Sequence, residues 1–410
     1  MLFYIYMALS QILKESEIDR LLIGNPQITY FKSVFRRHTP FYKGVYTYQE
    51  HDILNENPVR EELSHGTYDL ITNIFLETNI IQGAGTIYAN LGNNIVEEIT
   101  FNVGGNALCT VEGLYMEARA ELDHPYVPSV NSNNTSPPIM VTPGALKCNT
   151  GSQYNVQTMA GGVTGLASVT ITDTFYTYPN FYFCRDYGSA FPICALNSTD
   201  VVLEIKYRDG TDITGGDITT FTSTVNVEYV NLSDDERLRF INNTDMYIFY
   251  DILPLFISNK SIHEDSGKNH PIRQIFFVGT TETLSEEESL STPVSLSNTP
   301  IILTGINIKI NSKELYETPI TNLSIFTKQN INRLYPGYGR ELATSGTKGY
   351  WDSIGVHSFC LDTTNTPSGH LSTNTPFTID FTTTVSNIQI YLEVIKFYRI
   401  MGGQLGLLYI

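Results

Sequence analysis

Positive charge is scarce in this sequence. Only 16% of its 410 residues are charged, and 25 Lys and Arg face 42 Asp and Glu, which leaves a formal net charge of −17. A surface of this sign repels a phosphate backbone, so the composition argues against wholesale nucleic-acid binding and predicts no direct nucleic-acid partner.

Long apolar runs and cysteine pairs are missing too. No stretch approaches the roughly 20 consecutive apolar residues of a membrane-spanning helix. The opening MLFYIYMAL lacks the charged segment of a signal peptide. The five cysteines are odd in number and show no CxxC spacing, which indicates free, mostly buried thiols in a reducing compartment. They are Cys109, Cys148, Cys184, Cys194 and Cys360.

Catalytic and metal-binding patterns are also lacking. Adjacent carboxylates such as Glu61-Glu62 and Glu97-Glu98 point to opposite faces of a strand, so such pairs seldom cooperate as acid and base. The eight histidines form no HxH or HExxH motif and no Cys/His cluster. We therefore expect no enzyme, and neither a cofactor nor a metal.

The sequence is rich in aromatic and small polar residues. Aromatics make up 12% of the chain, with 26 Tyr and 21 Phe, which is typical of sheet rather than helix. Apolar residues alternate with polar ones in both halves of the chain, and each such run predicts a half-buried antiparallel strand. The clearest runs are at residues 99–103, 203–207, 225–229, 306–310, 377–381 and 388–394.

Two features interrupt the predicted strands. Residues 129–174 are rich in Ser, Thr, Asn, Gly and Pro and predict a long surface loop, in which the sequons at Asn133 and Asn134 are candidate glycosylation sites. The charged run NLSDDERLRFIN predicts a short helix with Ser233 as its N-cap, and we place the domain junction there.

The length and pattern predict an all-β protein of two sandwich domains. A chain of 410 residues exceeds one ordinary core. Long loops between strands are typical of jelly rolls, whereas immunoglobulin-type repeats turn at short intervals. We expect a double jelly roll with a short N-terminal helix and arm. The expected parts are a helix (10–22) and basic arm within 1–44, a first jelly roll at 45–232, a linker helix at 233–245 and a second jelly roll at 246–410.

The N-terminal arm combines positive charge with aromatic side chains in an acidic protein. The segment FKSVFRRHTPFYKG predicts an arm whose aromatics pack on protein while its basic heads reach acidic surface of the same or another chain. The alternative, a nucleic-acid stripe, has only about four positive charges to support it. The assembly-arm residues are Tyr30, Phe31, Lys32, Phe35, Arg36, Arg37, Phe41 and Lys43.

Six segments, in order along the chain, resemble one protein family. They are LIGNPQITYFKSVFRRHTPF, LGNNIVEEITFNVGGNAL, FYFCRDYGSAFPICAL, VEYVNLSDDERLRF, PSGHLSTNTPFTIDF and VIKFYRIMGGQLGLLYI. The first closely resembles the N-terminal signature of the major capsid proteins of nucleocytoplasmic large DNA viruses. The others are similar to that family's strand and turn segments, its linker helix and its Gly-rich C-terminal tail, so the resemblance spans nearly the whole chain.

The resemblance implies a structural role. It implies two jelly rolls per chain and a homotrimer that forms a pseudo-hexagonal capsomer in an icosahedral shell. The implied location is the virion, after assembly in the host cytoplasm. The implied partners are neighbouring capsomers and minor capsid proteins, with the inner viral membrane as a candidate contact of the arm.

Two alternatives remain open from the sequence. One is a minor or paralogous capsid component of the same fold. The other, from a different class, is a secreted β-sandwich carbohydrate-binding protein, which the aromatics, sequons and acidic charge would also permit.

Overall fold

The computed structural model describes most of the chain from residue 41 onward. It describes residues 41–63, 66–87, 91–123, 166–209, 217–243, 245–255, 261–264, 270–280, 302–322, 354–363, 367–372, 375–381 and 387–408, together with residues 25, 27, 29, 31, 32 and 36–40. The chain divides into two units, Met1–Pro40 and Phe41–Ile410. The predicted helix at 10–22 lies outside the described residues.

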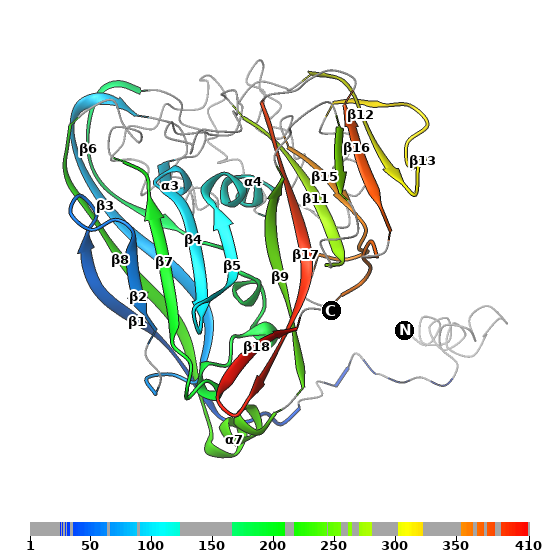
Figure 1. Ribbon diagram of the computed structural model, residues 1–410. Coiled ribbons are helices and arrows are strands. Elements are labelled where there is room, and N and C mark those ends of the chain that lie inside the picture. Colours follow the sequence, from blue (N-terminus) through cyan, green and yellow to red (C-terminus); the bar gives the residue numbers. More distant parts are fainter. Residues whose placement is uncertain are drawn as a thin grey trace, which may run out of the picture. The chain divides into compact units, whose positions relative to one another are not determined.

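The strands of residues 41–232 pair only with one another. One sheet has the order β1-β8-β3-β6 and the other β2-β7-β4-β5, and every pairing is antiparallel (Figure 1). The strands are β1 (Phe41–Asp52), β2 (Val59–Glu62), β3 (Leu70–Ile87), β4 (Val96–Val103), β5 (Asn106–Glu112), β6 (Leu166–Thr177), β7 (Val201–Tyr207) and β8 (Ile218–Leu232).

The strands after residue 245 form a second pair of antiparallel sheets. One has the order β10-β16-β12-β13, with β14 beside β12, and the other β15-β11-β17-β18, with β9 beside β17. The strands are β9 (Met246–Leu255), β10 (Ser261–Glu264), β11 (Ile272–Gly279), β12 (Ile302–Ile310), β13 (Lys313–Glu314), β14 (Ile320–Asn322), β15 (Ile354–Ser358), β16 (Phe377–Phe381), β17 (Ile388–Met401) and β18 (Gln404–Leu408).

Alternation predicts the positions of these strands well, although residues 388–394 of β17 are buried on both faces rather than half-buried. In β7 every second side chain is buried, and β4, β8, β12, β16 and β17 contain the other predicted runs. Gly104 and Gly105, with φ of +61° and +78°, form the two-residue turn between β4 and β5. Such a turn requires positive φ at both positions, which glycine adopts without steric cost.

Among the described residues helices are few, and only the linker helix was predicted. The linker helix α7 (Asp234–Asn242) forms where the charged run predicts it, with Ser233 at the N-cap, although the Ser233 side chain makes no capping hydrogen bond. The helix α4 (Gly113–Asp123) follows β5 directly. The others are α3 (Leu91–Asn94) and the short 3-10 helices η2 (Tyr182–Cys184), η3 (Tyr187–Ser189) and η4 (Ile193–Ala195).

The predicted loop at 129–174 was partly wrong. Residues 166–174 belong to β6, which pairs with β3, so the Ser/Thr-rich composition hid a strand there. Threonine and valine in the run LASVTITDTFYT favour the extended backbone. Residues 129–165, with Asn133 and Asn134, lie outside the described residues.

A continuous apolar core joins the two strand groups. It contains Phe101 and Phe181 from the first group and Phe249, Tyr391 and Tyr398 from the second. A second cluster fills the space between β12, β16 and the neighbouring sheet of the second group. Because one core spans both groups, the body from Phe41 onward forms one compact unit.

Candidate functional site

The predicted arm residues fall into two structural settings. Lys32, Arg36 and Arg37 are exposed in the N-terminal unit, and Phe31 is fully exposed there. Phe41 and Lys43 instead belong to the edge strand β1, where both are exposed. Tyr30 and Phe35 lie outside the described residues.

Lys43 is fixed on the surface of the body. Its ammonium group lies 3.0 Å from Glu228 of β8 and 4.5 Å above the Tyr187 ring, and it donates a hydrogen bond to the Tyr187 hydroxyl. These contacts with Tyr187 and Glu228 raise the pKa of Lys43. Lys43 therefore holds the start of β1 in place, and the described Lys and Arg residues of the N-terminal unit are Lys32, Arg36 and Arg37.

A bidentate ion pair attaches α7 to the first strand group. Arg237 donates to both carboxylate oxygens of Asp69, at 2.7 and 3.0 Å. The same carboxylate accepts the backbone N–H of Leu232 at 2.7 Å. Asp69 thus accepts hydrogen bonds both from the last residue of β8 and from the helix α7. It therefore fixes the direction in which the chain leaves the first strand group.

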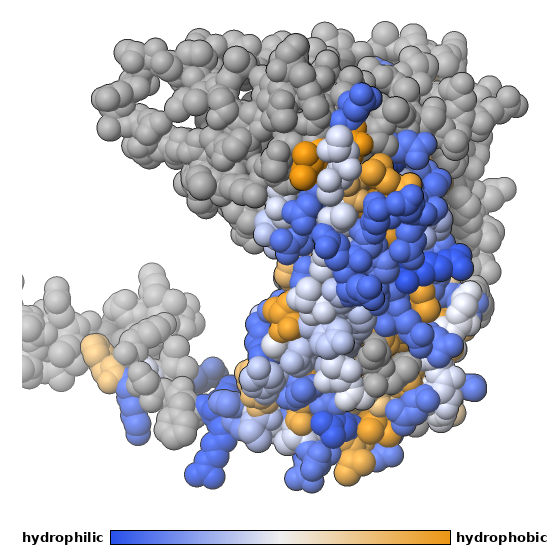
Figure 2. All heavy atoms as spheres, turned by 90° about the vertical axis from the view of Figure 1, so that its left-hand side faces the viewer, coloured by the Kyte–Doolittle hydropathy of each residue, from blue (hydrophilic) through white to orange (hydrophobic). Residues whose placement is uncertain are grey.

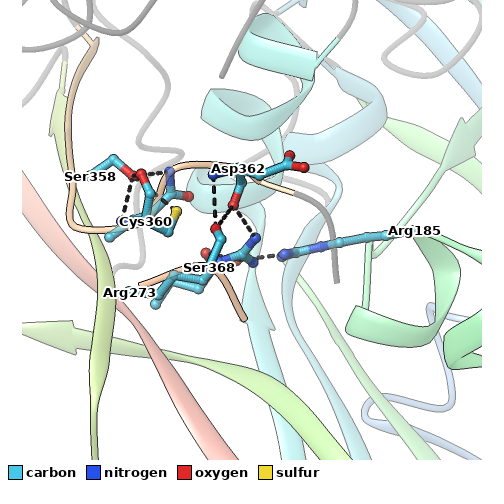
Figure 3. Close-up of polar contacts among 8 residues, drawn as sticks. Arg185, Arg273, Ser358, Cys360, Asp362 and Ser368 are labelled. Atoms are coloured by element: carbon cyan, nitrogen blue, oxygen red, sulfur yellow. Dashed lines mark hydrogen bonds and ion pairs between the residues drawn. The ribbon is translucent and has the colours of Figure 1, made fainter. Parts of the chain in front are cut away.

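A buried ionic cluster links the two strand groups. Glu393 of β17 is fully buried and lies 2.6 Å from Arg185, which follows η2, and 3.4 Å from Arg273 of β11. Arg273 also donates to the Asp362 carbonyl at 3.0 Å and lies 4.3 Å from the Tyr250 ring centroid. Figure 3 shows Arg185 and Arg273 reaching this point from opposite sides.

The arginines keep Glu393 ionised despite its burial. Burial alone would raise the pKa of Glu393, but Arg185 and Arg273 outweigh it, with a smaller contribution from Arg119, and hold that pKa at about 2. Sequence patterns did not single out this cluster. The signal that could have found it is Arg273 itself, a charged residue inside the apolar strand IRQIFFVG.

Further polar contacts cross between the groups. The Tyr182 hydroxyl donates to the Tyr398 hydroxyl at 3.1 Å, and the Tyr391 hydroxyl donates to Glu112 at 2.7 Å. At the other side of the core, the turn after β17 accepts the backbone N–H of Ser198 at the Gly403 carbonyl, 3.1 Å away. The two groups are thus joined by packing, hydrogen bonds and charge.

One histidine lies between two carboxylates. The two ring nitrogens of His51 are 3.0 Å from Glu56 and 2.7 Å from Glu61. Burial lowers the pKa of His51, but the hydrogen bonds to both carboxylates outweigh it and raise that pKa overall. This arrangement is an ion pair that joins β1 to β2, and among the described residues no His, Cys, Asp and Glu group has the geometry of a metal site.

The four cysteines among the described residues are free thiols, as predicted. Cys109 and Cys360 are buried, while Cys184 and Cys194 are half-buried, and burial raises the pKa of Cys184 to about 12. Cys148 lies outside the described residues. Within the described part of the chain, no helix combines the length and the apolar character needed to cross a bilayer.

Comparison with known families gives a match over more than half of the chain. The family described as "Major capsid protein N-terminus" matches residues 29–251. That range runs from the N-terminal unit through β1 to β8 and α7 and into β9.

Curated relatives are similar over about two thirds of the chain. The major capsid protein of Pyramimonas orientalis virus is 25% identical over 280 residues, 66% of this chain and 64% of that protein. Capsid protein 1 of Acanthamoeba polyphaga mimivirus is 25% identical over 288 residues, 63% of this chain and 46% of that protein. The matches thus span about half to two thirds of these relatives' length.

Solved structures share the fold. The PBCV-1 virus capsid protein superposes with a TM-score of 0.67 at 18% identity, over 93% of this chain and all of that chain. The Faustovirus major capsid protein does so with a TM-score of 0.58 at 10% identity, over 95% of each chain. At these identities the likeness concerns the fold, which is the predicted double jelly roll.

Proposed function

The chain belongs to the major capsid protein family, and from this membership we propose that it is a structural capsid protein of a large icosahedral DNA virus. The observation that carries the proposal is the family match over residues 29–251. The double jelly-roll fold supports it independently, because that fold appears in capsid proteins of this kind whose sequences are far diverged. A structural role of this kind involves no catalytic step.

The proposed assembly unit is a homotrimer. Each body offers two sheet pairs, residues 45–232 and 246–410, joined through the linker at 233–245. Three copies related by a three-fold axis would present six near-equivalent sandwiches, and six-sided tiles cover a closed shell. The rigid connection between the sheet pairs supports this role, because the tile's outline depends on their fixed relation.

The proposed location is the virion shell, with assembly in the host cytoplasm. The partners we propose are neighbouring capsomers, minor capsid proteins and, as a candidate contact of the N-terminal unit, the inner viral membrane. The basic residues Lys32, Arg36 and Arg37 support a contact with an anionic surface, whether of a protein partner or of the membrane.

The mass of the purified protein in solution tests the proposal. The chain mass is 46.0 kDa, and light scattering on a sizing column is expected to give three times that value. A stable monomer at all concentrations up to those of assembly would contradict the capsomer and favour either a minor capsid role or the carbohydrate-binding alternative. The carbohydrate-binding alternative also predicts retention on immobilised glycans, which the capsid roles do not.

A further inference from the structure

Exposed apolar side chains gather at one end of the body, around α7. Leu238 and Ile241 project from the helix, and Met246 and Ile248 from the start of β9, each with more than a third of its surface exposed. Hydrophobic residues are also visible in Figure 2 at the lower end of the molecule, the height at which α7 lies in Figure 1. We name Leu238, Ile241, Met246 and Ile248, with Asp234, Asp235 and Asp245, the α7 surface.

The local structure forces these side chains outward. Arg237 is held by Asp69, whereas the side chains of Leu238 and Ile241 are exposed. Because they are three residues apart in the helix, Leu238 and Ile241 lie next to each other on one face of α7. The apolar residues of a surface helix normally face the core of the protein. The exposure of apolar residues on both α7 and β9 therefore indicates a surface that binds a partner.

The start of β9 is fixed against the end of α7. The Asn243 side chain donates to the Tyr247 hydroxyl at 3.2 Å, and the Tyr247 ring stacks on Tyr398 with centroids 5.0 Å apart. Because successive residues of a strand point to opposite faces, Met246 and Ile248 then point away from the core. The apolar residues of α7 and β9 therefore form one preformed surface.

The rim of this surface is acidic. Asp234, Asp235 and Asp245 are exposed, and Arg239 is the exposed positive residue of the helix. The other arginine, Arg237, is occupied by Asp69. A negative rim disfavours an anionic lipid surface or a nucleic acid and favours a partner that is positively charged and aromatic.

The chain itself contains a segment of that chemistry. Residues 27–40, QITYFKSVFRRHTP, carry Lys32, Arg36 and Arg37, and no Asp or Glu occurs between residues 20 and 49. Every described residue of this segment is exposed, including the fully exposed Phe31. Arginine and aromatic residues are enriched where protein interfaces form.

We propose that residues 27–40 of one copy bind the α7 surface of the next copy in the trimer. The inference rests on the proposed trimer, since a three-fold axis places the α7 ends of all copies on the same side. Residues 27–40 fully extended reach roughly 45 Å, whereas a body of this size has a radius of gyration of roughly 21 Å. The segment, which joins β1 at Phe41, is long enough to reach a neighbour.

The first experiment is a cross-link between differently tagged copies. Lys32→Cys carried by one tag is co-expressed with Leu238→Cys carried by the other, and the purified trimer is oxidised mildly. We expect a covalent dimer that contains both tags. The matched control replaces Leu238→Cys with Glu317→Cys. Glu317 is exposed and follows β13 by three residues in the chain, and β13 lies at the opposite end of the body from α7 in Figure 1.

A charge exchange provides the second experiment. Asp235→Lys with Asp245→Lys is expected to lower the cross-link yield about tenfold at low salt, because like charges then face each other. Adding Arg36→Glu and Arg37→Glu is expected to restore the yield. Restoration also shows that the reversed protein is folded, and Glu317→Lys is the control reversal that leaves the yield unchanged.

The outcomes separate this inference from the proposed function. A trimeric mass with no more two-tag dimer than the Glu317→Cys control would overturn the arm exchange and leave the capsomer intact. A two-tag dimer that survives the charge reversal undiminished would also overturn the assignment of the acidic rim. A monomeric mass would instead contradict the proposed function itself.

Discussion

At the scale of single residues, the Glu393 cluster shows how charge can fix the relation between two domains. Arg185 comes from the first strand group, and Glu393 and Arg273 come from the second. Removing Arg185 takes from the buried Glu393 the closer of its two arginine partners, which costs more than losing a surface pair. The cluster therefore stabilises one arrangement of the groups against others.

We predict that Arg185→Met destabilises the protein by about 3 to 5 kcal/mol at neutral pH. Urea denaturation measures the loss. Arg60→Met is the matched control, because Arg60 forms a 3.1 Å pair with Glu204 while 68% of its side chain is exposed. An exposed pair contributes about 0 to 1 kcal/mol, so comparable losses in the two variants would contradict a special role of the buried cluster.

The ion pair between Arg185 and Glu393 makes the stability of the protein depend on pH. Because Arg185 and Arg273 lower the pKa of Glu393 to about 2, its stabilising effect is present above the ordinary carboxylate pKa. The effect is lost as the pH falls from about 4.5 toward 2, where Glu393 takes up a proton. The difference between the natural protein and Arg185→Met is expected to shrink across this window.

At the scale of elements, the presence or absence of alternating apolar and polar residues explains which strands could be predicted from the sequence. β7 faces the core on one side only, so apolar and polar residues alternate along its sequence. β11 is buried along its entire length and shows no alternation, which is why period-two patterning did not predict it. The helix α4 was missed because GLYMEARAELD has no N-cap signal and is buried on most sides.

The pairing of β1 with β8 depends on a glycine. Gly44 lies opposite Tyr229, and a Cβ atom at Gly44 would stand 2.5 Å from the Tyr229 hydroxyl oxygen. The Tyr229 ring can therefore lie across β1 and stack on Tyr68, with centroids 5.3 Å apart. The edge strand is held by this ring together with the contacts of Lys43.

We predict that Gly44→Ala destabilises the protein by about 1 to 3 kcal/mol, the usual cost of overpacking. Gly406→Ala is the matched control in a strand, because its nearest neighbour would be 4.0 Å from the new Cβ. A thermal melt of both variants measures the difference. Truncating the ring in Gly44→Ala/Tyr229→Ala should remove the clash, so strictly additive losses would show that the ring is not its cause.

At the scale of the whole molecule, the sequence predicted the fold but not the contacts that unite its halves. The strands were predicted from the local alternation of apolar and polar residues, and the linker helix from its charged residues. Each of these patterns lies within one short segment of the chain. The ion pair between Arg185 and Glu393 joins residues 208 positions apart. The α7 surface likewise became visible only when the structure showed which apolar residues of α7 and β9 are exposed.

The N-terminal unit offers the last prediction, because a series of truncations separates two roles. Removing residues 1–30 retains Phe31, Lys32, Arg36 and Arg37, so trimers are expected to persist while shell assembly is impaired. Removing residues 1–40 also deletes the segment that binds the α7 surface, so these trimers are expected to dissociate at a higher protein concentration. Sedimentation velocity measures the trimers, and electron microscopy the shells. If both truncations left equally stable trimers, the segment would act only between capsomers, since nothing inside the trimer would have lost a contact.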